Sequence, residues 1–399
     1  MLFIVVVVGD MKINEWVPGT FPIPFFQTWC CKNSSITPSS SFVVSDAGVD
    51  ACIWRQLRDA GLPPKMYECI HDNLTFNRVG VDCIHYLFHD QDCRSFIERE
   101  YPPDVLMAYD RLIPTAFKAD LWRYCVLYKY GGAYLDVKYK WGGPSPNDGS
   151  EGVPPPSDGS AGQLSSKSAV NIDHQSELTA HCEGGPSPSD GLESGLSSNA
   201  AAAVHTSAMT LRDIVERFGL TGSGGDGGGC DDIFVLERDG IGLWPPGRFG
   251  IHNAFMVVKP KNPILLECIC RIVSAAKQLR YALGGLDDDY SAGWITRPLF
   301  VTGPGLLGDV WRVRLGASLG SMIPDSYATM ASYFRLFFEG DGVIGYYNGD
   351  DSYIKLFKVY DDYHEEYRHM MCNTNCVPHY TVLWSRGVVW GGGDIFTLL

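Results

Sequence analysis

The chain has 399 residues, of which 45% are hydrophobic and 20% are charged, a composition typical of a globular protein with a sizeable core. Acidic residues outnumber basic ones 46 to 32, which gives a formal net charge of −14. This balance argues against nucleic acid as the main partner, because a phosphate backbone favours a basic surface. It excludes neither a small anionic ligand nor an enzyme. Disorder over the whole chain, collagen and coiled coils are excluded by composition and by the lack of a matching repeat.

The first predicted element is the apolar run from Leu2 to Val8. It has about a third of the roughly 20 residues that a membrane-spanning helix needs. No basic segment typical of a signal peptide precedes it. Two interpretations stay open for residues 1–20, namely a buried strand or the end of a truncated membrane anchor.

Strands and helices are predicted on both sides of a polar central segment. The strands, rich in aromatic and β-branched residues, are Pro24–Trp29, Ile233–Glu237 and Ala254–Val258. The helices are Asp50–Ala60, Gln91–Tyr101 and Pro263–Leu279. Strands mixed with helices of this length predict a layered α/β fold.

The central segment, residues 142–208, is rich in Gly, Pro, Ser and Asp. It contains a near-repeat, with GGPSPNDGS from Gly142 and GGPSPSDGL from Gly184. Such a composition buries too little apolar surface to offset the entropy lost on ordering. We therefore predict a disordered insertion at 142–208 between two parts of one α/β domain, residues 21–141 and 209–391.

The most informative stretch is Pro114–Lys140. Its apolar spacing predicts a helix with Thr115 as the N-terminal cap. Gly131 and Gly132 are predicted to end this helix. The alternation that follows predicts a strand from Ala133 to Tyr139.

Four charged side chains stand out in this stretch. Asp120 and Arg123 are three residues apart and share a helix face, and Asp136 and Lys138 are two apart and share a strand face. A helix–Gly-Gly–strand unit can bring both pairs to one cleft. There the carboxylates would bind hydroxyls or a cation, and the cations would bind phosphate oxygens. The alternative is a set of surface salt bridges on an amphipathic helix.

The run ADLWRYCVLYKYGGAYLDVK from Ala119 resembles the DXD sugar-binding region of glycosyltransferase family 32. That family includes initiation-specific α-1,6-mannosyltransferases and inositol-phosphoceramide mannosyltransferases. Its pattern is an Asp and an Arg on a helix, followed by Gly-Gly-x-Tyr-x-Asp-x-Asp. Other runs resemble further blocks of the family, namely IPFFQTW from Ile23, IHNAFMVVKPKNPILL from Ile251, VTGPG from Val301 and HYTVLW from His379.

The resemblance implies a Rossmann-like GT-A fold that binds a nucleotide-sugar. It implies transfer of a hexose, with retention, from GDP-mannose or a UDP-hexose to a hydroxyl of a glycan or glycolipid. It also implies a location in the Golgi or another secretory-pathway membrane.

Residue by residue, the family's donor-binding Asp and Arg map onto Asp120 and Arg123. Its first DXD Asp maps onto Asp136, which would bind Mn²⁺ or Mg²⁺. His379 is a second candidate metal ligand, because a late His in GT-A enzymes often reaches the metal or the diphosphate. The full set of substrate-binding candidates is Asp120, Arg123, Gly131, Gly132, Asn253, Gln27 and Trp29.

Two positions depart from the family pattern. Phe26 replaces the His of the opening block, and Lys138 replaces the second DXD Asp. A lysine there would repel a metal and supply part of its charge beside the donor diphosphate. Asp136 and Lys138 are therefore the catalytic candidates, and metal dependence is left open. The alternative function is a catalytically impaired homologue that still binds a sugar nucleotide.

Weaker motifs compete with this hypothesis. Gly303–Gly308 matches G-x-G-x-x-G after a strand-like Pro298–Thr302, but no clear helix follows, so a turn lining the donor cleft is favoured over a dinucleotide site. Glycosylation sequons begin at Asn33 and Asn73. A zinc-dependent interaction protein is a third hypothesis, and it depends only on His364, His369, Cys372, Cys376 and His379.

Overall fold

The computed structural model describes residues 5–7, 13–29, 62–142, 209–218, 232–237, 244, 249–279, 297–318, 333–339, 342–348, 352–373, 379–386 and 388–391. All of them belong to one unit, formed by Met1–Ser150 and Ser207–Leu399. The predicted helix at Asp50–Ala60, the sequon at Asn33 and nearly all of the predicted insertion lie outside the described residues. None of the helices in the described part of the chain has the length and apolar content needed to cross a membrane.

The first sheet has five strands in the order β1-β3-β2-β4-β7. They are β1 (Val5–Val7), β2 (Ile23–Trp29), β3 (Cys83–His89), β4 (Gly132–Leu135) and β7 (Phe255–Val258). The first four pair in parallel, and β7 joins β4 antiparallel. The central strands are apolar on both faces, as expected for a parallel sheet covered on both sides.

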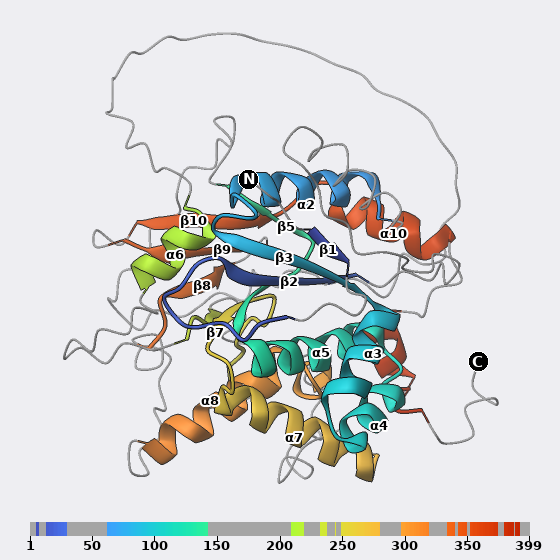
Figure 1. Ribbon diagram of the computed structural model, residues 1–399. Helices are drawn as coiled ribbons and strands as arrows, with labels where there is room; N and C mark the ends of the chain where they lie inside the picture. The colour runs from blue at the N-terminus through green and yellow to red at the C-terminus, as the bar shows by residue number, and fades with distance from the viewer. Residues whose placement is uncertain are drawn as a thin grey trace, which may run out of the picture. The chain divides into compact units, whose positions relative to one another are not determined.

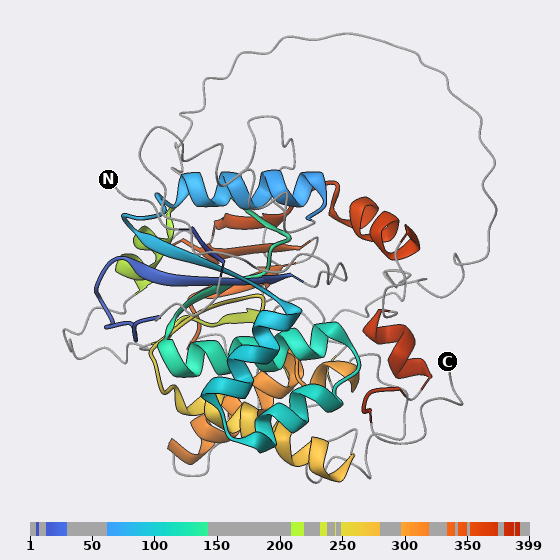
Figure 2. The same ribbon diagram turned by 45° about the vertical axis from the view of Figure 1, so that its right-hand side comes forward.

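Successive residues of these strands feed two separate cores. Phe26, Tyr134 and Met256 belong to the first core, whereas their neighbours Phe25 and Ala133 belong to the second. Helices cover the first core on one side of the sheet, as both views show (Figures 1 and 2). They are α3 (Asp90–Glu100), α4 (Pro103–Arg111), α5 (Thr115–Tyr130), α7 (Pro263–Gln278) and α8 (Pro304–Ser318).

The second core lies between the first sheet and a second sheet of order β5-β10-β9-β8-β6. Phe255 of β7 packs on Phe357 and on Trp141, with ring centroids 4.7 and 6.3 Å apart. The strands are β5 (Tyr139–Trp141), β6 (Val235–Glu237), β8 (Leu336–Glu339), β9 (Val343–Tyr347) and β10 (Tyr353–Val359). Helices α2 (Pro64–Phe76) and α6 (Leu211–Phe218) also contribute to this core. The mixed sheets and their helices confirm the predicted α/β, Rossmann-like GT-A class.

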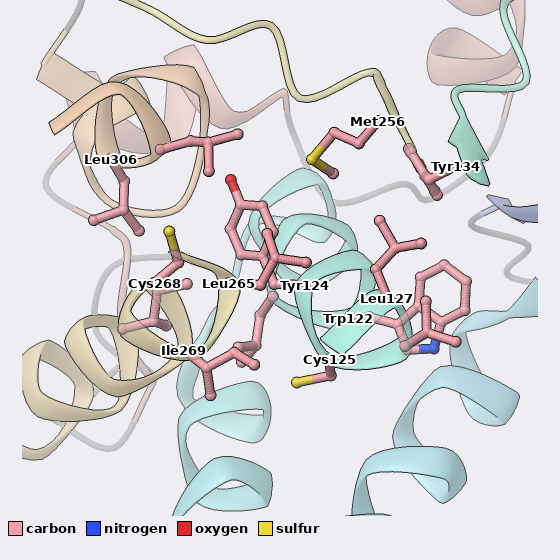
Figure 3. Close-up of a cluster of buried hydrophobic side chains, with 14 of the residues drawn as sticks. Trp122, Tyr124, Cys125, Leu127, Tyr134, Met256, Leu265, Cys268, Ile269 and Leu306 are labelled. Atoms are coloured by element: carbon pink, nitrogen blue, oxygen red, sulfur yellow. The ribbon is translucent and has the colours of Figure 1, made fainter. Parts of the chain in front are cut away.

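Helix α5 is buried on most of its surface. Phe117, Leu121 and Tyr124 are buried at the expected helical spacing, and the neighbouring Trp122 and Cys125 are buried as well. The reason is that α5 lies between the sheet and α7, so that both of its sides face apolar neighbours (Figure 3). Thr115 as the N-terminal cap is wrong, because the cap position is occupied by Pro114 and no side chain caps the helix.

The predicted strand from Ala133 to Tyr139 is interrupted. β4 ends at Leu135, and a turn closed by a hydrogen bond from Tyr139 N to Asp136 O (3.1 Å) leads into β5. The chain leaves the first sheet at this point and enters the second, which a pattern of alternating side chains does not reveal. Asp136 and Lys138 therefore do not share one strand face.

Two further expectations are corrected. Pro298–Thr302 is not a strand, because a 3₁₀ helix spans Arg297–Phe300, and α8 begins directly after Gly303. Asn73 is fully buried, with Nδ2 donating to Tyr139 O (2.7 Å) and Oδ1 accepting from Trp141 N (2.6 Å). It joins α2 to β5 and is not accessible to a glycan.

Gly131 and Gly132 make the reversal between α5 and β4, with φ of 66° and 99°. A Cβ on Gly132 would overlap the carbonyl oxygen of Pro24, whereas one on Gly142 (φ 123°) would meet no atom within 4 Å. Both substitutions by Ala add backbone strain, and only Gly132→Ala adds a steric overlap. We expect Gly132→Ala to lower the free energy of unfolding by about 2–3 kcal/mol more than Gly142→Ala. Urea unfolding of both variants measures this, and equal losses would contradict it.

Candidate functional site

The site lies where β4 and β7 meet. Leu135, the last residue of β4, pairs with Phe255, the first of β7. Because these strands are antiparallel, the residue after one strand lies beside the residues before the other, and Asp136 N donates to Ala254 O (2.8 Å). Asp136 and Asn253 are thus neighbours at the carboxyl end of the parallel strands. This is the edge at which open α/β sheets bind ligands.

Helix α5 supplies Arg123, which joins two acidic side chains. Its Nη2 lies 3.2 Å from Asp120 Oδ1, and its Nη1 lies 3.3 Å from Asp136 Oδ1 and donates to Asn253 O (2.7 Å). The guanidinium also covers the ring of Tyr134, 4.4 Å from its centroid. Asp120 and Arg123 are only 8% and 5% exposed. The alternative of surface salt bridges is therefore wrong.

Asp120 is held by a closed network of polar groups. Its Oδ2 accepts from Thr302 Oγ1 (2.8 Å), and its Oδ1 accepts from Asn253 Nδ2 (3.0 Å). Tyr124 completes the network, because its hydroxyl accepts from Asn253 Nδ2 (3.1 Å) and donates to Thr302 O (2.7 Å). The segment that opens α8, with Gly303 beside Asp120, is thus part of the site and not a separate dinucleotide motif.

The pKa values of the carboxyl groups of Asp120 and Asp136 shift in opposite directions. Burial raises the pKa of Asp120, and Arg123, Thr302 and Asn253 offset this only in part. Burial also opposes ionisation of Asp136, but Arg123, Lys138 and the Tyr134 hydroxyl outweigh it and lower the pKa of Asp136. Asp136 therefore stays ionised at neutral pH.

Two comparisons relate the chain to known proteins. Residues 38–139 match the family model described as a glycosyltransferase sugar-binding region containing a DXD motif. This part of the chain is thus similar to the sugar-binding region of the DXD glycosyltransferases. The initiation-specific alpha-1,6-mannosyltransferase of Candida albicans is 34% identical over 86 residues, which cover 21% of this chain and 22% of that protein. Both findings confirm the predicted resemblance to family 32. No solved structure matches the chain.

The surroundings of Asp136 include a residue that sequence reasoning missed. His252 lies between Glu237 and Tyr139, with Nδ1 3.1 Å from Glu237 Oε1 and Nε2 2.8 Å from the Tyr139 hydroxyl. Its ring stacks on Phe338 with centroids 4.1 Å apart. His252 also helps to lower the pKa of Asp136. Its position directly before Asn253 in the sequence was the available signal.

Aromatic side chains from the end of the chain approach the same carboxylates. Tyr363 of α10 (Tyr363–Asn373) interacts electrostatically with Asp136, and Tyr380 of α11 (Tyr380–Ser385) with Asp120. Figure 2 shows both helices, drawn in red, on the side toward which β2 points. Both rings also pack on other rings of the chain, Tyr363 on Tyr367 and Tyr380 on Phe117.

Other predicted site residues support the fold around the site. Gln27 is fully buried; its Nε2 donates to Leu135 O (3.1 Å), and its Oε1 lies 2.9 Å from His85 Nε2. Burial lowers the pKa of His85 to about 3, so the ring is neutral. Gln27 thus fixes the strand end just before Asp136. Trp29 lies in the second core.

His379 has a structural contact of its own. Its Nδ1 accepts from Thr381 N (3.4 Å) and caps α11, and its ring lies 4.3 Å from that of Tyr380. The structure does not bring it into contact with Asp136 in any described interaction. Its role as a metal ligand stays a prediction.

Glycosyltransferases with a DXD motif generally use a divalent cation. The possible metal ligands around Asp136 fit such a cation poorly. Asp136 Oδ1 accepts from the Tyr134 hydroxyl (2.7 Å) and faces Arg123, and Oδ2 lies 3.6 Å from Lys138 Nζ. Hard cations need several oxygen ligands, most of them carboxylates or carbonyls. Among the described residues, no group of three His, Cys, Asp or Glu side chains is arranged to hold a metal.

The lowered pKa of Asp136 predicts a pH dependence of stability. A carboxyl group whose folded-state pKa lies below its ordinary value, near 3.8, stabilises the fold at neutral pH. This contribution is lost as the pH falls through the folded-state pKa. We expect Asp136→Asn to be less stable than wild type by about 3 kcal/mol at pH 7, with a gap that narrows below pH 4.

Urea unfolding in EDTA from pH 7 to pH 3 measures this gap. The matched control is Asp361→Asn, which removes an exposed carboxylate paired with Lys358. It should stay within about 0.5 kcal/mol of wild type. A gap for Asp136→Asn that stays constant with pH would show that its ionisation does not stabilise the fold.

Proposed function

We propose that the chain is a glycosyltransferase that moves a hexose, with retention, from a nucleotide-sugar to a hydroxyl of a glycan or glycolipid. The observation that carries this proposal is the largely buried network of Asp120, Arg123, Asp136 and Asn253 at the carboxyl end of β4. The first three of these residues lie inside the matched sugar-binding region. We propose mannose as the hexose and GDP-mannose as the donor. The support is the initiation-specific alpha-1,6-mannosyltransferase of Candida albicans, which is 34% identical to this chain over 86 residues.

The polar groups of the network suit a sugar and a diphosphate in different ways. Asp120 and Asn253 are fixed by several partners, so they can accept hydrogen bonds from sugar hydroxyls without reorganising. The guanidinium of Arg123 is paired with two carboxylates, so its role is to hold the site together. Lys138 is 28% exposed at its side chain and is the cation of the set that can reach a phosphate oxygen.

The proposed function makes a prediction about the donor. A ligand that binds only the native state raises the free energy of unfolding, by about 2.7 kcal/mol at a concentration of 100 times its Kd. We expect GDP-mannose to raise the melting temperature more than UDP-glucose, UDP-galactose or free mannose. A larger increase in melting temperature with a UDP-hexose would identify that compound as the donor in place of GDP-mannose. The absence of a shift with every nucleotide-sugar would contradict the proposed function.

The second prediction concerns Asp136. Asp136→Asn keeps the size of the side chain but removes the charge that orients Arg123 and Lys138. We expect transfer from the donor to fall by a factor of about 10² or more, while circular dichroism shows the wild-type fold. Asp361→Asn should keep the wild-type rate. If Asp136→Asn turned over near the wild-type rate, Asp136 would have no role in the reaction.

One observation favours a second function. Because Lys138 replaces a motif carboxylate, the chain could be a homologue that binds a sugar nucleotide and transfers nothing. Wild-type protein that binds GDP-mannose, but neither hydrolyses it nor transfers mannose with or without Mn²⁺, would establish this alternative.

A further inference from the structure

Lys138 is rigidly placed beside Asp136. Its backbone lies in the turn between β4 and β5, which is closed by the Tyr139 N to Asp136 O bond, and its own carbonyl accepts from Tyr360 N (3.1 Å). Its ammonium lies 3.6 Å from Asp136 Oδ2, and the ring centroids of Tyr139 and Tyr363 are 5.5 and 6.0 Å away. An exposed lysine seldom keeps one orientation. Here a carboxylate and two rings restrict the side chain.

The charges of the site are balanced by this lysine. Asp120 and Asp136 carry two negative charges, and Arg123 and Lys138 carry two positive ones. A carboxylate at position 138, as in the DXD motif that names the family, would leave the same set with an excess of two negative charges. Such a site would repel a diphosphate unless a metal cation entered with it. With lysine the site can accept the diphosphate without a metal.

The ligand positions around Asp136 point in the same direction. Each of its carboxylate oxygens already faces a protein cation, Arg123 for Oδ1 and Lys138 for Oδ2. A divalent cation would have to approach between these two positive groups. A phosphate oxygen, in contrast, would gain from both charges and would find the ammonium of Lys138 partly exposed.

We propose that Lys138 takes the place of the divalent cation, so that the site binds the diphosphate of a nucleoside diphosphate without metal. This inference depends on the proposed function for the identity of the ligand. In the transfer, the bond between the anomeric carbon and the diphosphate oxygen breaks, and its electron pair stays on that oxygen. The acceptor oxygen bonds to the anomeric carbon, and the acceptor's proton passes to the departing diphosphate. Lys138 stabilises the negative charge that develops on the leaving group.

The test measures the Kd of GDP for the full chain by calorimetry, once in EDTA and once in Mn²⁺. The proteins are wild type, Lys138→Ala, Lys138→Asp and the control Lys140→Ala. Lys140 is on β5, two residues away, and its exposed ammonium pairs with Asp72 at 2.9 Å. Circular dichroism and urea unfolding establish that each variant is folded before its Kd is interpreted.

We expect wild type and Lys140→Ala to bind GDP equally well in EDTA and in Mn²⁺. Lys138→Ala should weaken binding about 10- to 100-fold in both, the range of a hydrogen bond to a charged group. Lys138→Asp should bind weakly in EDTA and recover in Mn²⁺. Wild-type binding that requires Mn²⁺, or an unchanged Kd in Lys138→Ala, would overturn the inference.

The outcomes separate this inference from the proposed function. Metal-free, Lys138-dependent binding of GDP without any transfer would support the inference and overturn the transferase. Transfer that requires Mn²⁺ would support the transferase and overturn the inference. Wild-type protein that binds neither GDP nor UDP under either condition would overturn both.

Discussion

The burial of Arg123 between two carboxylates is the interaction on which the rest of the site depends. A buried guanidinium is tolerated only when its desolvation is offset by charged and polar partners. Arg123 has such partners in Asp120, Asp136 and the carbonyl of Asn253. These come from α5, the end of β4 and the segment before β7. The ion cluster therefore joins the helix–strand unit to a segment that lies 130 residues after Arg123 in the sequence. Removing the charge of Arg123 would leave the buried carboxylate of Asp120 without its cationic partner, at a cost of about 3–5 kcal/mol.

The sheet topology explains why the cluster forms at this place. A parallel strand delivers its following residue to the carboxyl edge, and an antiparallel neighbour delivers its preceding residues to that same edge. β4 and β7 are such a pair, and they bring Asp136 next to Asn253. The chain reverses at Gly131 and Gly132, so that α5 packs against the sheet with Asp120 and Arg123 directed toward this edge. The chemistry of the site thus follows from one antiparallel strand added to a parallel sheet.

Local spacing was sufficient to predict part of this arrangement. The i, i+3 relation of Asp120 and Arg123, the glycine stop and the helix at Pro263 all depend on near neighbours in the chain. Non-local pairings were not predictable in this way. The turn at Asp136 exists because β5 pairs with β10, more than 200 residues later; the alternation of Ala133 to Tyr139 contains no sign of it.

The same limit applies to single side chains. Gln27 has the polarity of a ligand-binding residue, but its amide is used by Leu135 and His85 inside the sheet. His252 was overlooked because only the second sheet, through Glu237 and Tyr139, gives it partners. Whether a polar residue beside a buried strand supports the fold or binds a ligand depends on which strands lie next to it. The order of the strands in the sheet cannot be deduced from the sequence.

Lys138 and Arg123 show how two cations divide the work of one site. Arg123 has a planar group with several donors; it is almost completely buried, and it organises the carboxylates. Lys138 carries a compact charge on a flexible stem, and it is the more exposed of the two. A metal ion would have to be bound again with each donor, whereas a covalently attached ammonium is present before the donor arrives. The favourable interaction with a diphosphate is then limited only by how firmly Asp136, Tyr139 and Tyr363 hold the lysine in place.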